Sequence, residues 1–334
     1  MIHEEPLRSY LRSDDFLMSL NIPRETDLVF ELLGQGEYNL NYMFSHPVTG
    51  QKLVLRINRG SQMHLADQIG YEYAALKCLE SSGRTPRPLF CCPEQHLLVM
   101  EWLPGRALDY TTDMGAAAGI LADIHSVPVP DGCQLIRPEA PAMAIYEECL
   151  DMVQHYYDWE DADPQVTELL RTLVEEIGKL PLTEPSDAPV CIVNTELNSG
   201  NFLIDRDGVS HLVDWEKPLL SEPAQDLGHF LAPTTTFWKT DVILTPAEVK
   251  AFTENYIGAV AGRMDTGSLA SRLPLFFTVT CLRGVTWCAM AYREYCQPGR
   301  ELRNEDTFTK IKAYLEPSFL QNLLDNYVRK DFLA

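Results

Sequence analysis

Positive charge is what this sequence has least of. Its 334 residues include 27 Lys and Arg against 48 Asp and Glu, which gives a formal net charge of −21 at pH 7. Proteins that bind nucleic acid need basic patches that displace counterions from phosphates, so the composition argues against a nucleic-acid partner. It is compatible with cationic substrates or partners, although net charge alone does not identify one.

Signals for export or membrane insertion are also scarce. The N-terminal residues "MIHEEPLRSY" contain neither the basic stretch nor the apolar stretch of a secretion signal. The longest apolar run, 273–291, is about long enough to span a bilayer, but it contains Pro274, Arg283 and Gly284. Because an unpaired arginine is costly inside a bilayer, we expect a buried helix and no membrane span.

The nine cysteines show no spacing typical of a metal site, and two of them, Cys91 and Cys92, are adjacent. In a chain of this length a disulfide framework is not expected. The cysteines are therefore predicted to be reduced thiols, which indicates a cytoplasmic protein.

The first hundred residues have the pattern of a small antiparallel sheet. Short runs with period-two character, bounded by turn residues, predict five strands. Between the third and fourth strands, apolar residues at helical spacing predict one helix that ends at Gly83. The strands are expected within 27–33, 38–44, 50–58, 87–92 and 96–103.

From Pro104 onward helical patterns dominate. Helices are expected at 114–127, over most of 143–180, and through much of the chain after residue 245. A strand–loop–strand–turn–strand unit interrupts them at 189–214, with "DRDG" as its turn. A hydroxyl-rich run, "APTTTFWKT", follows at 232–240 and includes Thr234 to Lys239; its role is open. The pattern predicts an α+β protein with two lobes, 1–102 and 103–334.

Three polar residues are predicted at the mouths of the three strands of this unit. Asn201 and Asp214 lie at adjacent strand ends, and amide and carboxylate oxygens of this kind are suitable ligands for Mg²⁺. Glu196, in the preceding loop, is placed to meet an incoming hydroxyl. Phosphoryl transfer needs such parts, namely a divalent cation and a group that orients the nucleophile. The alternative is that each residue only forms a turn.

The first lobe contains parts that fit the same chemistry. Gly34 and Gly36 lie in the hairpin between the first two strands, where bare backbone could approach phosphates, although hairpins also use glycine for their own geometry. Arg56 is a cation within an apolar strand and needs a partner, for which Glu72 on the following helix is the candidate. The alternative is that both side chains point to solvent.

Taken in order, these parts resemble those of a kinase. The segment 194–201, "NTELNSGN", is similar to the H-G-D-L-H-P-G-N loop of the aminoglycoside phosphotransferase and choline kinase family, which has a protein-kinase-like fold. Asp214-Trp215-Glu216 matches its D-W-[EDG] motif, and "EPAQDLGHF", with Asp226, matches its D-P-A-x-D-L motif. The resemblance covers nearly the whole chain. It implies a bilobal fold, with a five-stranded N-terminal nucleotide-binding lobe and a larger, mainly helical lobe for catalysis and acceptor binding.

The resemblance also implies roles for individual residues. In the first lobe Gly34 and Gly36 would approach the phosphates of ATP, and Arg56, paired to Glu72, would replace a phosphate-contacting lysine. The adenine slot would be lined, through backbone groups, by Met100, Glu101 and Trp102.

In the second lobe the resemblance implies that Asn201 and Asp214 bind Mg²⁺ and that Glu196 takes the place of the catalytic aspartate. Asp226 would brace the catalytic loop through backbone hydrogen bonds. His125 matches a family histidine and is expected to pack in the core. The implied reaction transfers the γ-phosphate of ATP to a hydroxyl of a small molecule.

Two central positions depart from the family pattern. Glu196 keeps the charge of the aspartate but adds a methylene, and Arg56 keeps the charge of the lysine but has a wider, forked group. Asn194 also replaces the loop histidine. The site is either adapted to its own acceptor, or the protein is a nucleotide-binding pseudokinase with a regulatory or scaffold role. Because the metal-binding pair and a carboxylate are all retained, an active enzyme is favoured.

The acceptor-binding region is expected between residues 147 and 187, where 12 acidic residues stand against two basic ones. Such a region could hold an amine-bearing acceptor, and Tyr156, Tyr157 and Trp159 could stack on a sugar or face a cation. The alternative is a solvated acidic helix face. No segment resembling a protein-kinase activation loop follows Asp214, so a small-molecule acceptor is predicted.

Overall fold

The computed structural model describes residues 5–36, 38–297, 305–330 and 332. The chain forms two compact units. The first comprises Met1–Leu108, Val127–Leu135 and Asn201–Pro218, and the second comprises Asp109–Ser126, Ile136–Gly200 and Leu219–Ala334. Two later segments of the chain thus belong to the first unit. The division into functional lobes at residue 102 stays a prediction.

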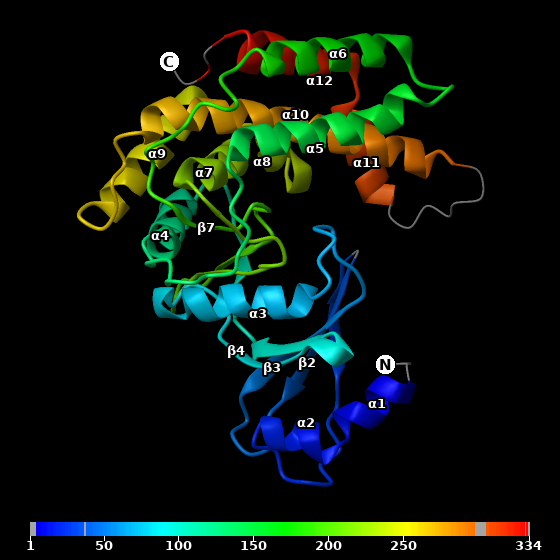
Figure 1. Ribbon diagram of the computed structural model, residues 1–334, viewed down its shortest axis with the longest axis vertical. Helices are drawn as coiled ribbons and strands as arrows, with labels where there is room; N and C mark the ends of the chain where they lie inside the picture. Colours follow the sequence, from blue (N-terminus) through cyan, green and yellow to red (C-terminus); the bar gives the residue numbers. More distant parts are fainter. Residues whose placement is uncertain (1–4, 37, 298–304, 331, 333–334) are drawn as a thin grey trace. The chain divides into compact units, whose positions relative to one another are not determined.

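The first unit is built on a five-stranded antiparallel sheet (Figure 1). The strands are β1 (Glu31–Gln35), β2 (Asn39–Ser45), β3 (Lys52–Asn58), β4 (Pro88–Cys92) and β5 (Leu97–Glu101), in the order β1-β2-β3-β5-β4. The helix α3 (Gln68–Leu79) follows β3. The predicted α+β class, the five strands and the position of the single helix after the third strand are therefore confirmed.

The alternation of side chains along β3 separates an apolar face from a polar one. Leu53, Leu55 and Ile57 are buried in a cluster with two short N-terminal helices, α1 (Glu5–Leu11) and α2 (Asp14–Ser19). The intervening Arg56 points to the opposite face, because successive strand residues alternate in direction. These two helices were not predicted; they are only 7 and 6 residues long, too short for a clear helical period.

The predicted strand–loop–strand–turn–strand unit divides between two small sheets. In the first unit β8 (Phe202–Ile204) pairs antiparallel with β6 (Arg106–Ala107) and with β9 (His211–Leu212). In the second unit β7 (Cys191–Val193) pairs with β10 (Leu219–Ser221). The expectation that β8 and β9 form a hairpin is confirmed, whereas the strand that leads to Glu196 belongs to a different sheet.

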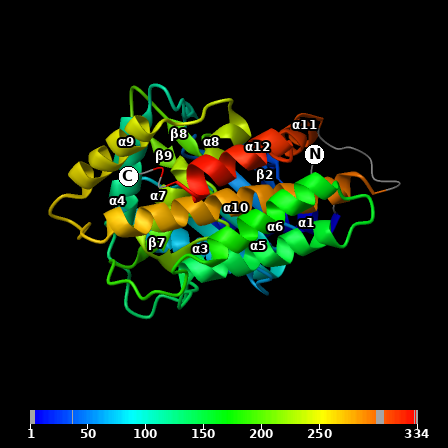
Figure 2. The same ribbon diagram turned by 90° about the horizontal axis from the view of Figure 1, so that it is seen from above.

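Helices make up most of the second unit. They are α4 (Met114–His125), α5 (Pro141–Tyr157), α6 (Pro164–Gly178), α7 (Pro223–Leu231), α8 (Pro233–Lys239), α9 (Pro246–Val260), α10 (Leu269–Tyr295), α11 (Glu305–Tyr314) and α12 (Pro317–Leu323). The long α10 runs beside α5 and contacts α6, α7, α8 and α11 (Figure 2).

The helix α10 is long and apolar enough to cross a membrane by length and composition alone, but 67% of its most apolar window is buried inside the protein. It therefore forms the core of the second unit, as predicted for this apolar run.

The hydroxyl-rich run at 232–240 forms α8, and its threonines belong to the core of the second unit. Thr234, Thr235 and Thr236 are buried. The hydroxyl of Thr234 donates to the carbonyl of Thr280 on α10 at 3.1 Å, and the Thr234 carbonyl accepts from the Tyr314 hydroxyl at 2.7 Å. This run therefore joins α8 to α10 and α11.

Glycine allows α7 to approach α10 closely. A Cβ atom on Gly228 would lie 2.6 Å from the backbone nitrogen of Phe277 and 2.7 Å from Cβ of Phe276. Because part of this contact is backbone, it cannot be relieved by a rotamer change. Gly119, in the middle of α4, has no heavy atom within 4 Å of the same position.

We predict that Gly228→Ala destabilises the protein by about 1–3 kcal/mol through overpacking. The matched substitution Gly119→Ala should stabilise it by about 0.5–1 kcal/mol, because alanine is the better helix former. Urea unfolding of both variants measures the difference. A Gly228→Ala variant as stable as wild type would contradict the close packing of α7 on α10.

Candidate active site

The first unit holds Arg56 in a ring of polar partners on the α3 side of the sheet. The strand register places Arg56 opposite Asn41, and its Nε donates to Oδ1 of Asn41 at 3.0 Å. Its Nη1 donates to Oε1 of Glu72 on α3 at 2.7 Å. The two side chains are only 7% and 2% exposed. The predicted Arg56–Glu72 pair is therefore formed, and it does not point to solvent.

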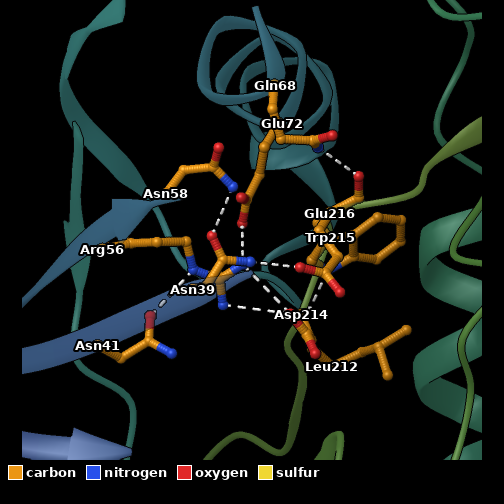
Figure 3. A network of polar contacts seen from close by, with 10 residues as sticks. All are labelled: Asn39, Asn41, Arg56, Asn58, Gln68, Glu72, Leu212, Asp214, Trp215 and Glu216. Carbon is orange, nitrogen blue, oxygen red and sulfur yellow. Dashed lines mark hydrogen bonds and ion pairs between the residues drawn. The ribbon is translucent and has the colours of Figure 1, made fainter. Parts of the chain in front are cut away.

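Asp214 completes this arrangement (Figure 3). Nη1 and Nη2 of Arg56 each lie 3.2 Å from Oδ1 of Asp214, so the guanidinium bridges the helix carboxylate and the carboxylate that follows β9. Asp214 has a φ of +66°, a left-handed conformation that few non-glycine residues adopt. The buried Trp215 supports this turn, since its indole Nε1 donates to the Leu212 carbonyl at 3.0 Å. Backbone strain of this kind is often found at functional sites.

Arg56 and the carboxylates of this cluster stabilise each other's charged forms. Burial alone would lower the pKa of Arg56, but Glu72, Asp214 and Glu216 outweigh it and raise the pKa above its ordinary value. Burial also raises the pKa of Glu72, although Arg56 opposes that effect. The second carboxylate oxygen of Glu72 has no hydrogen-bond partner among the described residues. The buried carboxylate therefore depends on Arg56 for its stabilisation.

The segment after Asp214 is fastened to the sheet and to α3 by residues that the sequence did not single out. Gln68 donates to the carbonyl of Glu216 at 2.6 Å, and the Asn39 amide donates to the Glu216 carboxylate. The Tyr71 hydroxyl donates to the Pro218 carbonyl at 2.6 Å. Two features of the sequence point to these contacts: Glu216 belongs to the D-W-E motif, and asparagines occupy alternate positions of β2.

Asn201 is held next to this cluster by the β8–β9 pairing. Its carbonyl accepts from the backbone nitrogen of Val213 at 2.9 Å, so Asn201 lies beside the residue that precedes Asp214. The prediction that the two residues occupy adjacent strand ends is confirmed.

The two residues together offer one amide and one carboxylate, a donor set that suits Mg²⁺, which takes few protein ligands and completes its shell with phosphates and water. The Asp214 side chain is 38% exposed, so it is accessible to a ligand. Among the described residues there is no group of three or more His, Cys, Asp or Glu able to hold a metal by themselves. The residues present therefore fit a magnesium ion bound together with a nucleotide; their role as its ligands stays a prediction.

The other residues predicted to contact the nucleotide lie along the sheet. Gly34, predicted in the hairpin turn, instead lies within β1, where it pairs with Asn41, and no heavy atom lies within 4 Å of a Cβ position on it. Gly36 follows the strand, as predicted. Met100 and Glu101 end β5, and Trp102 comes next. The backbone nitrogens of Glu101 and Trp102 already donate to carbonyls of the sheet region, so a contact to adenine would have to use other groups. These roles also stay predictions.

The second unit holds the loop that contains Glu196. Both carboxylate oxygens of the fully buried Asp226 accept from this loop, from the backbone nitrogens of Asn194 at 2.8 Å and Thr195 at 2.9 Å. His125 lies 3.2 Å from Asp226 and 2.9 Å from the Tyr256 hydroxyl, and it is buried. The predicted bracing role of Asp226 and the packed position of His125 are therefore confirmed.

Glu196 has two further restraints within the second unit. Its backbone nitrogen donates to Oδ1 of Asn194 at 3.1 Å, so the asparagine at the family's histidine position stabilises the loop itself. Its Oε1 accepts from Nη2 of Arg283 on α10 at 3.1 Å. Thr195, just before it, has a φ of +69°. Arg283 was not identified as part of the site, because its sequence context is an apolar helix.

The aromatic residues of the acidic region are mainly structural. Tyr156 is 1% exposed, and its hydroxyl accepts from the backbone nitrogen of Asp163 at 3.2 Å. The ring of Trp159 packs edge-on between Tyr156 and Tyr292. Stacking of Tyr156 on a bound sugar, one of the interpretations from the sequence, is therefore wrong, because its ring is part of the core.

Several solved structures share the fold of this chain. An ethanolamine kinase from Plasmodium vivax superposes with a TM-score of 0.64 at 16% identity, over 96% of this chain and 91% of that one. A choline kinase from Streptococcus pneumoniae gives 0.61 at 15% identity, over 95% and 100%. A spectinomycin phosphotransferase, solved with ADP and spectinomycin, gives 0.61 at 15% identity, over 97% and 95%.

No curated protein shows significant similarity to the chain. A family model, in contrast, matches residues 29–264 and is described as the phosphotransferase enzyme family. The matched region includes Arg56, Glu72, the loop of Glu196, and Asp214. The protein-kinase-like fold expected from the sequence is confirmed, and the chain belongs to the phosphotransferase enzyme family.

Proposed function

We propose that the protein is an ATP- and Mg²⁺-dependent kinase that phosphorylates a hydroxyl group of a small, amine-bearing molecule. The observation that carries the proposal is the position of Arg56 between Glu72 and Asp214. Kinases of this fold use a strand cation paired to a helix carboxylate, next to a metal-binding aspartate. A buried guanidinium that meets both carboxylates reproduces this relation with arginine in the place of lysine.

The first unit would bind the nucleotide. Asn201 and Asp214 would hold the magnesium ion, which when bound bridges phosphate oxygens and neutralises their charge. Arg56 would offset charge that develops on the transferred group, while Glu72 keeps the guanidinium in place. Asp214 would then divide its interactions between Arg56 and the metal, and its partial exposure is what makes this possible.

In the second unit Glu196 would accept a hydrogen bond from the acceptor hydroxyl and orient it for attack. Asp226 would act indirectly, since it holds the backbone of Asn194 and Thr195 and thereby the loop. The longer side chain of Glu196, compared with aspartate, is restrained by Arg283.

The acceptor class is supported by two observations. The structural neighbours include kinases named for ethanolamine, choline and spectinomycin, which all contain amine or ammonium groups. The α5–α6 region has a strong excess of carboxylates that would attract a cation, although most of them are exposed to solvent.

A second candidate function is a nucleotide-binding pseudokinase with a regulatory or scaffold role. The contact between Arg283 and Glu196 favours it, because a carboxylate engaged by a guanidinium is a weaker base. The two functions differ in one measurable property, the formation of a phosphorylated product.

Glu196→Gln is expected to lower turnover about a hundredfold, because the amide cannot accept the hydroxyl proton as a carboxylate does. ATP affinity should change less than about twofold. The measurement is ADP formation with ethanolamine, choline and spectinomycin as acceptors, together with ATP titration calorimetry. Glu254→Gln, at an exposed position of α9 outside the acidic region, is the control and should match wild type. Full turnover in Glu196→Gln would exclude Glu196 from the chemistry.

Arg56→Met is expected to destabilise the protein by about 3–5 kcal/mol, because it leaves the buried Glu72 carboxylate without a counter-charge. The double variant Arg56→Met/Glu72→Gln removes both charges and should recover most of that loss in urea unfolding. Both variants should bind ATP weakly. If the double variant is no more stable than Arg56→Met, the loss does not come from the uncompensated carboxylate.

A further inference from the structure

Arg283 is a partly buried cation in the middle of the apolar helix α10. Its Nε lies 3.0 Å from Oε2 of Glu148 on α5, and its Nη2 lies 3.1 Å from Oε1 of Glu196 and 3.5 Å from Oε1 of Glu148. Its Nη1 lies 3.5 Å from the Thr195 carbonyl. All four groups belong to the second unit. The guanidinium therefore joins α5 to the side chain and the backbone of the Glu196 loop.

The charge of this arginine is maintained by its partners. Burial alone would lower the pKa of Arg283, but the carboxylates of Glu148 and Glu196 outweigh it and raise the pKa above its ordinary value. The Arg283 side chain is 16% exposed and that of Glu196 30%. A buried cation inside an apolar helix is unfavourable unless it is paired, so the position of Arg283 requires a structural or chemical reason.

The loop that contains Glu196 explains the position of Arg283. Asp226 fixes the backbone at Asn194 and Thr195, and Asn194 holds the backbone nitrogen of Glu196. These bonds act on the backbone of the loop, whereas the Glu196 side chain has one rotatable bond more than aspartate. A group that orients a nucleophile loses much of its effect when it is misplaced by about 1 Å. Nη2 of Arg283, 3.1 Å from Oε1 of Glu196, restrains the carboxylate itself.

We propose that Arg283 is a positioning residue, which holds the longer Glu196 side chain where it can orient the acceptor hydroxyl. The inference rests on the proposed kinase function. In that reaction a bond forms between the acceptor oxygen and the γ-phosphorus as the bond from that phosphorus to the bridging oxygen breaks. ADP leaves with the electron pair, and the hydroxyl proton passes to Glu196 and then to solvent. Arg283 contacts neither reactant and acts through Glu196.

The ion pair between Arg283 and Glu196 could instead inhibit the protein, and that role predicts the opposite change in turnover. If the ion pair withdrew Glu196 from the reaction and silenced the protein, removing the guanidinium would raise turnover. If the arginine positions Glu196, removing it lowers turnover. The sign of the effect therefore decides between the two roles.

The test compares Arg283→Met and Arg283→Lys with Arg263→Met as the matched control. Arg263 also forms an ion pair in the second unit, with its Nη1 at 2.7 Å from Oδ1 of Asp123. The readouts are kcat and KM for ATP, with magnesium and with ethanolamine, choline or spectinomycin as acceptor. Arg283→Met should lower kcat about tenfold with KM for ATP within about twofold. Arg283→Lys should recover part of that loss, and Arg263→Met should match wild type within about twofold.

A second comparison separates positioning from a general loss of structure. In a Glu196→Gln background, Arg283→Met should lower the remaining turnover by less than about twofold, because residues that act as a unit are not additive. An equal loss in both backgrounds would overturn the inference, as would turnover in Arg283→Met at or above the wild-type value. If Arg283→Met does not fold, Arg283→Lys decides: unchanged kcat would contradict the role.

Failure of the inference is distinguishable from failure of the proposed function. A wild-type protein that turns over while Arg283→Met is equally fast would contradict the positioning role alone. A wild-type protein that shows neither magnesium-dependent ATP binding nor ADP formation would overturn the kinase function, and the positioning role with it.

Discussion

The ion pair between Arg56 and Glu72, shared with Asp214, is the interaction on which the rest of the first unit depends. A guanidinium and a carboxylate that are both almost fully buried must stay together, because separation would leave either charge without compensation. This requirement joins three elements, the strand β3, the helix α3 and the turn after β9. It also holds the carboxylate of Asp214, which is partly exposed, beside a permanent positive charge.

In the second unit, too, a buried polar group with several partners fixes the loop. The carboxyl group of Asp226 is fully buried, and its partners are two backbone nitrogens and His125. The loop that results places Glu196 on a backbone with a left-handed residue just before it. Arg283 then restrains the side chain. Each unit therefore contains one partly exposed carboxylate next to an arginine, Asp214 beside Arg56 and Glu196 beside Arg283.

Periodicity and motif order predicted much of this architecture. The alternation of apolar residues identified the five strands, and an isolated cation in β3 together with a carboxylate on α3 identified the pair of Arg56 and Glu72. Arg283 could not be found in this way, because it lies 87 residues from Glu196 in the sequence and inside an apolar run. The hydroxyl-rich run was visible in the sequence, but its place in the core was not, because a threonine such as Thr234 packs there only when a carbonyl of a neighbouring helix accepts its hydrogen bond.

If Asp214 and its neighbours form a magnesium–nucleotide site, as we propose, thermal unfolding should reveal it. Wild type, Asp214→Ala and Asp207→Ala, an exposed control in the β8–β9 turn, would each be heated without ligand, with ATP, and with ATP and Mg²⁺. At a ligand concentration of about a hundred times Kd, binding should stabilise the protein by about 2.7 kcal/mol. We expect a magnesium-dependent rise in Tm for wild type and Asp207→Ala that is lost in Asp214→Ala. An equal rise in all three proteins, or no rise with any nucleotide, would contradict it.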